Sequence, residues 1–126
     1  MKGIVPVDIE LLQKSRILRI SFDDANIYDF SYEFLRVFSP SAEVRGHSPQ
    51  GSVLQIDKVD VGITSVDLVG NYALKINFDD GHDTGLYTWS YFQKLGANKE
   101  KMWDGYLNRL LKEGYNRDNW IARVGK

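Results

Sequence analysis

Most of the side chains in this sequence that could support chemistry lie in one short segment. Residues 78–89 read FDDGHDTGLYTW, where an apolar run leads into three aspartates and one of the two histidines of the chain. A histidine among carboxylates is the composition of a metal site, of a general base with an orienting acid, or of a polar turn. These three alternatives frame the functional interpretation.

An iron site would need two histidines and a carboxylate. His47 and His82 could supply the imidazoles, with Asp79, Asp80 or Asp83 as the third ligand. The His-x-Asp spacing that is typical of iron oxygenases is missing, because no acid lies two residues after either histidine. The chain has no cysteine, which excludes disulfides, a thiolate nucleophile, iron–sulfur ligation and a zinc finger.

A catalytic role has little support from the motifs. His82 beside Asp83 matches a base and its orienter only in composition, and the chain has no Gly-x-Ser-x-Gly elbow. Gly81 and Gly85 do not form the Gly-x-Gly-x-x-Gly of a dinucleotide-binding loop. We therefore expect no enzyme activity, and interpret His82 as a neutral imidazole that bonds the loop backbone near Tyr87 or an aspartate.

Alternating apolar and polar residues predict the strands that would position this loop. The predicted strands lie at about 7–11, 18–22, 27–28, 59–68 and 72–78. Gly70-Asn71 indicates a hairpin, and a three-residue loop from Val69 to Asn71 would pair Leu68 with Tyr72 and Val66 with Leu74.

Capping residues predict three helices. Ser31 would cap one through about Val37, Thr88 would cap WSYFQKL up to Gly96, and the last would run from about 99 to 113. Residues 39–52 read as a long loop. An apolar stripe on the last helix indicates core packing, with a partner groove as the alternative. Its members are Met102, Trp103, Tyr106, Leu107, Leu110 and Leu111.

The strand and helix pattern occurs twice. Residues 18–34 (LRISFDDANIYDFSYEF) and 74–92 (LKINFDDGHDTGLYTWSYF) share Leu-x-Ile-x-Phe-Asp-Asp and an aromatic-Ser-Tyr, with three extra residues in the second loop. Such self-similarity predicts one supersecondary unit used twice. Because Asp-Asp recurs, Asp79 and Asp80 are interpreted as turn formers, and His82 is expected at the tip of an enlarged loop.

The second unit also resembles a known family. YALKINFDDGHDTGLYTWSYF, with YEFLRVFSPSAEVR upstream, is similar to the gamma-butyrobetaine hydroxylase-like N-terminal domain, also called DUF971, over roughly residues 5–95. The resemblance implies a small domain that precedes an iron and 2-oxoglutarate catalytic domain in the hydroxylases. In this family, the small domain also occurs alone in bacteria, and related domains are fused to iron–sulfur scaffold ATPases.

In the hydroxylases the family's domain holds a structural zinc through three cysteines and one histidine. The resemblance places that histidine at His82 and the cysteines at Ser39, Ser41 and Val44. Serine is a poor zinc ligand and valine is none, so we expect the zinc to be lost. Iron or zinc binding linked to oxygenase or iron–sulfur chemistry remains the alternative.

Charge is unevenly distributed along the chain, whose net charge is −1. Residues 1–93 carry 8 basic and 13 acidic side chains, whereas residues 94–126 carry 8 basic and 4 acidic ones. The basic part could bind nucleic acid, but its bases are scattered, so a solvated helix face is the simpler interpretation. No apolar run approaches the roughly 20 residues of a membrane span.

Together these features predict a single α+β domain over residues 1–126. A mainly antiparallel sheet would be built from two similar strand–turn–strand–short-helix units within 5–95, followed by an amphipathic helix at 98–114 and a tail at 115–126. We expect a stand-alone, cytoplasmic, non-catalytic accessory domain with no cofactor, a monomer or weak dimer that binds another protein but neither membrane nor nucleic acid. The candidate binding residues are Arg36, Arg45, Asp80, Gly81, His82, Thr84 and Gly85.

Overall fold

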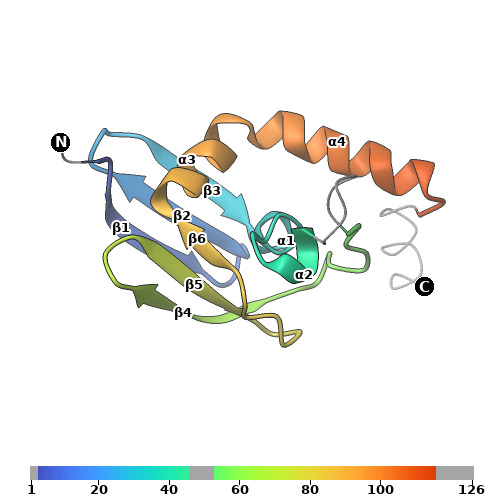
Figure 1. Cartoon of the computed structure of the whole chain (residues 1–126), viewed down its shortest axis with the longest axis horizontal. Helices are drawn as coiled ribbons and strands as arrows, with labels where there is room; N and C mark the ends of the chain where they lie inside the picture. The colour runs from blue at the N-terminus through green and yellow to red at the C-terminus, as the bar shows by residue number, and fades with distance from the viewer. Residues whose placement is uncertain (1–2, 46–52, 116–126) are drawn as a thin grey trace.

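The computed structural model describes residues 3–45 and 53–115, which form two antiparallel three-stranded sheets and four helices (Figure 1). The first sheet has the order β1 (Pro6–Leu12), β2 (Ile17–Phe22), β3 (Ile27–Ser31), and the second β4 (Ile63–Val69), β5 (Ala73–Phe78), β6 (Leu86–Thr88). The helices are α1 (Tyr32–Val37), α2 (Ala42–Arg45), α3 (Trp89–Ala97) and α4 (Lys99–Lys112). The α+β class is confirmed, and the strands divide between two sheets.

The predicted repeat is confirmed as two similar units, β1-β2-β3-α1 and β4-β5-β6-α3. Ser31 Oγ accepts the N–H of Phe34 at the start of α1, and Thr88 Oγ1 accepts the N–H of Tyr91 at the start of α3. Ser31 thus corresponds to Thr88, not to Ser90 as the sequence alignment implied. From the end of the middle strand to the cap, the second connection is longer by one residue instead of three.

The same five-residue turn follows the middle strand of each unit. The N–H of Phe22 donates to the carbonyl of Asn26 at 2.9 Å, and that of Phe78 donates to the carbonyl of His82 at 3.0 Å. His82 therefore occupies the position of Asn26, and the loop around it is not enlarged at this point. The expectation that His82 lies at the tip of an enlarged loop is wrong.

The second aspartate of each turn fixes the backbone in the same way. Asp24 Oδ1 accepts the N–H of Asn26 at 3.0 Å, and Asp80 Oδ1 accepts the N–H of His82 at 3.2 Å. An aspartate that accepts the N–H two residues later forms an Asx turn, which explains why Asp-Asp recurs. The residue between them has positive φ in both units, 72° at Ala25 and 89° at Gly81.

The hairpin between β4 and β5 has the predicted loop length but another register. Its three loop residues are 70–72, so Leu68 pairs with Leu74 and Val66 with Ile76. The predicted loop began and ended one residue too early. Gly70, at φ 53°, is the first of the three loop residues instead of the middle one. β4 also begins at Ile63 instead of about 59.

The core lies between the sheets and the helices that cover them. Buried residues from β2, β3, β5 and β6 form one cluster with α1 and α3. Tyr106 and Leu110 of α4 are buried, which confirms core packing for most of the predicted stripe, whereas Leu111 is exposed. The expected loop at 39–52 contains the one-turn helix α2, and residues 46–52 lie outside the described part.

Candidate functional site

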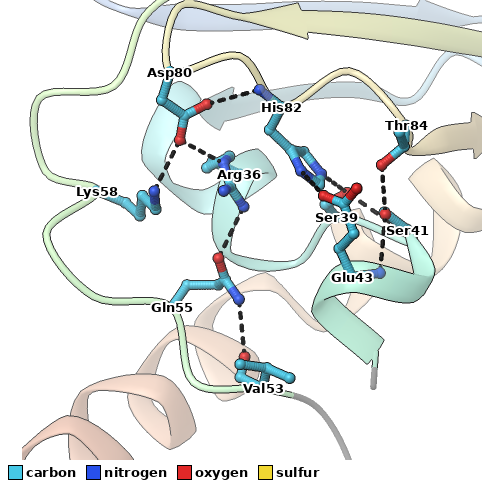
Figure 2. Close-up of polar contacts among 10 residues, drawn as sticks. All are labelled: Arg36, Ser39, Ser41, Glu43, Val53, Gln55, Lys58, Asp80, His82 and Thr84. Atoms are coloured by element: carbon cyan, nitrogen blue, oxygen red, sulfur yellow. Dashed lines mark hydrogen bonds and ion pairs between the residues drawn. The ribbon is translucent and has the colours of Figure 1, made fainter. Parts of the chain in front are cut away.

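His82 lies in the interior, between the turn after β5 and the segment from Ser39 to Arg45 (Figure 2). Only 6% of its surface is exposed. The Asx turn at Asp80 fixes its backbone, so its ring extends toward the segment that follows α1. The chain thereby brings residues about 40 positions apart into one polar cluster.

Both ring nitrogens of His82 have a side-chain partner. Nε2 is 2.8 Å from Ser39 Oγ, and Nδ1 is 3.2 Å from Glu43 Oε2. An ionised carboxylate only accepts, so Nδ1 carries the proton, and the hydroxyl of Ser39 donates to Nε2. Ser39 Oγ also accepts the N–H of Ser41 at 3.3 Å. The neutral imidazole is thus satisfied on both sides.

A serine, a histidine and a carboxylate in this order have the connectivity of a hydrolase triad. The exposure is the reverse of what catalysis requires. Ser39 is 2% exposed, while the side chain of Glu43, which would orient the base, is 66% exposed. Among the described residues the Ser39 hydroxyl is therefore covered, and its hydrogen bond to His82 links the two segments.

Two further contacts close the cluster. Ser41 Oγ and Thr84 Oγ1 are 2.6 Å apart, which joins the same two segments a second time. A Cβ built on Gly85 would overlap Ser39 Oγ, so only glycine allows the backbone of residue 85 to approach this closely. We refer to Ser39, Ser41, Glu43, His82 and Thr84 as the latch, because they join α2 to the loop before β6.

An ionic network lies next to the latch, centred on Asp80. Its Oδ2 accepts from Arg36 Nε at 2.9 Å and from Lys58 Nζ at 2.8 Å. Arg36 is buried, and its Nη1 donates to Gln55 Oε1 at 2.9 Å. The network ties α1 and the segment before β4 to the turn that carries His82 (Figure 2).

These surroundings shift the pKa of both ionisable residues in the turn. Burial and the charge of Arg36 lower the pKa of His82 from 6.5, and Glu43 opposes that shift only in part. Burial raises the pKa of Asp80, but hydrogen bonds from Lys58, from the His82 N–H and from Arg36 outweigh it and lower the value from 3.8 to about 2. At neutral pH the turn therefore holds an ionised aspartate and a neutral histidine.

The donor set does not fit the metal that the resemblance implies. His82 and Ser39 meet, and Ser41 belongs to the same cluster, whereas Val44 is a buried hydrocarbon without a donor atom. Within residues 3–45 and 53–115, no group of three or more His, Asp or Glu side chains is placed to hold a metal ion. His47 lies outside the described residues, so the two-histidine iron site has no geometry to examine.

Most of the predicted binding residues make internal contacts. Arg36 and Asp80 belong to the ionic network, and His82 and Thr84 to the latch. Arg45 is exposed at the end of α2, Gly81 is exposed at the apex of the turn, and Gly85 is buried against Ser39. Glu43, Gln55 and Lys58 were missed, because nothing in their local sequence indicates a partner 19 or more residues away.

The family model described as gamma-butyrobetaine hydroxylase-like, N-terminal, matches residues 9–93, which include the latch and most of both units. A comparison with curated proteins found no match. No helix among the described residues is long and apolar enough to cross a membrane.

Solved structures resemble the whole fold. Two proteins determined by solution NMR are each 45% identical, with TM-scores of 0.77 and 0.79. The alignments cover 91% of both chains in the first case, and 92% of this chain and 86% of the other in the second. A crystal structure from Acidithiobacillus ferrooxidans ATCC 23270 is 33% identical with a TM-score of 0.62, covering 73% of this chain and 92% of that one. That protein is described as a DUF971 family member of unknown function.

Proposed function

Because the chain belongs to the gamma-butyrobetaine hydroxylase-like N-terminal domain family, we propose that it is a non-catalytic protein-interaction domain. In this proposal, the latch holds together the segments that a zinc ion holds in the hydroxylases. The observation that carries it is the hydrogen bond of 2.8 Å between Ser39 and His82. It joins the position of a family cysteine directly to the position of the family histidine.

The proposed absence of catalysis is supported by the burial of Ser39 and His82. A nucleophile or a general base must reach its substrate, and Ser39 and His82 are both buried. Their polar atoms are committed to one another, to Glu43 and to the N–H of Ser41. Among the described residues, the arrangement favours a rigid scaffold that presents its outer surface to a partner.

Metal analysis tests the proposed replacement of the metal. Tag-free protein would be loaded with Zn²⁺, or with Fe²⁺ under anaerobic conditions, desalted and assayed for bound metal by elemental analysis. The set comprises wild type, His82→Ala and His47→Ala, which test separately the two histidines that an iron site would need. We expect no stoichiometric metal in any of them. Stoichiometric metal that is lost in His82→Ala, whether or not it is also lost in His47→Ala, would overturn the proposal and establish the metal-binding alternative.

The interaction itself needs a separate test. A candidate partner captured with the chain would be purified and mixed with it, and the complex would be measured by gel filtration and calorimetry. We expect a defined stoichiometry and no chemical change in either protein. Conversion of the partner or of a small molecule by the chain would contradict a non-catalytic role.

A further inference from the structure

The two sheets leave an apolar groove open between their edge strands. β1 is the outer strand of the first sheet and β4 of the second, and no further strand among the described residues pairs with their free edges. At one end the edges are bridged, because Gln13 Nε2 donates to the carbonyl of Ile63 at 3.1 Å. At the other end they flank a groove of about 390 Å³. β4 lies on the side of the molecule away from α4 (Figure 1).

The groove has an apolar lining that remains open to solvent. Pro6, Val7 and Ile9 line one side, Val66 and Leu68 the other, and Leu74 of β5 contributes to the base. Val7 is 66% exposed and Leu68 is 68% exposed, although Leu68 pairs with the fully buried Leu74. Two exposed aliphatic side chains on facing strand edges are unusual, because exposed edges invite pairing and are normally blunted by charge.

The charges on these edges select the kind of occupant. β1 carries Asp8 and Glu10, β4 carries Asp67, and neither strand has a lysine or an arginine. The nearest cross-strand cations lie one strand further in. They are Arg19, opposite Glu10, and Lys75, opposite Asp67. A second copy of this chain would bring like charges together, which is unfavourable. A basic segment would meet them with opposite charge.

We propose that an extended segment of a partner protein, with alternating apolar and basic side chains, binds in the groove between β1 and β4. Its backbone pairs with a free strand edge, as in other cases of strand addition. Its apolar side chains contact Val7 and Leu68, and its basic side chains face Asp8, Glu10 and Asp67. This inference rests on the proposed interaction function, and it names the surface and the chemistry of the partner.

The experiment uses a synthetic peptide of about eight residues that alternates lysine and valine, which is long enough for one strand. A matched peptide carries glutamate in place of lysine. Each is titrated into ¹⁵N-labelled full chain, and amide shifts are followed by NMR. We expect the lysine peptide to shift amides of β1 and β4, to bind more weakly as salt rises, and the glutamate peptide to leave them unchanged.

Two exposed leucines provide a matched pair of variants. Leu68→Lys places a cation in the groove, whereas Leu111→Lys makes the same change at an equally exposed position on α4. Because both side chains lie outside the core, we expect both variants to fold, which the NMR spectrum verifies. We expect Leu68→Lys to weaken peptide binding about tenfold, equivalent to about 1.4 kcal/mol, and Leu111→Lys to bind as wild type does.

Every other outcome of the peptide titrations counts against the proposed occupant of the groove. Equal binding of both peptides, equal loss in both variants, or no binding would overturn the proposed occupant. Edge-strand shifts that depend on protein concentration without peptide would assign the groove to a second copy instead. Peptide shifts confined to the latch would move the interaction to that surface and leave the proposed function intact. A metal held by His82 would overturn the proposed function without bearing on the groove.

Discussion

The ionic network at Asp80 gives the sharpest quantitative prediction. Asp80→Asn keeps an acceptor for the N–H of His82, so the Asx turn survives, but it removes the charge that Arg36 and Lys58 share. The pKa of Asp80 falls from 3.8 to about 2 on folding. Each pKa unit corresponds to about 1.4 kcal/mol, so the ionised form stabilises the fold by about 2 kcal/mol, as an order of magnitude.

The pH dependence follows from the direction of that shift. Since the carboxyl is more acidic in the folded chain, its contribution is complete above the unfolded-state pKa near 3.8 and disappears as pH falls toward about 2. Urea unfolding at a series of pH values should therefore show a deficit in Asp80→Asn at about pH 6 that shrinks below about pH 4.

The repeat supplies the control for this experiment. Asp24 makes the same Asx contact in the first unit, to the N–H of Asn26, and the described residues give it no ion pair. Asp24→Asn should therefore cost much less than Asp80→Asn. Equal losses in the two variants, or a deficit in Asp80→Asn that does not change with pH, would refute the assignment to the ionic network.

Three other predictions concern the latch. The lowered pKa of His82 means that wild type should lose stability as pH falls below about 6.5, and thermal melts should show that this loss is smaller in His82→Gln. Gly85→Ala should lower the free energy of unfolding by about 1–3 kcal/mol, because its Cβ would overlap Ser39. Gly105→Ala, in open space on α4, should leave that free energy unchanged or raise it. Urea unfolding of the two variants compares them. Replacing Ser39, Ser41 and Val44 together by cysteine should create Co²⁺ binding with thiolate charge-transfer absorption that wild type lacks.

The sequence predicted those parts of the fold whose signals are local. Ser31 and Thr88 cap their helices as expected, because a hydroxyl before an apolar helical run needs no distant partner. The repeat was recognised from shared residues, but its alignment was wrong near the second cap, because the shared aromatic-Ser-Tyr matched Ser31 with Ser90 instead of with the cap Thr88. The hairpin register was missed because Gly70 could begin the turn or lie within it.

The site was predicted less completely than the fold. The resemblance identified His82 and its family-equivalent partners, and the structure brings Ser39 to it. Glu43, Gln55 and Lys58 come from separate segments whose approach depends on packing of α1 and α2, so no spacing rule indicates them. The burial of His82 was also missed, because a histidine flanked by glycine and aspartate resembles an exposed turn residue.

The matching turns after β2 and β5 show that the backbone conformation at this position is the same with two different side chains. Asn26 and His82 fill equivalent backbone positions. In each unit the second aspartate of the turn and the last residue of the middle strand hold that position. The same backbone hydrogen bonds thus form around an asparagine in one unit and around a histidine in the other. The contacts of the His82 ring are then set by the segment opposite, at 39–43, which supplies Ser39 and Glu43.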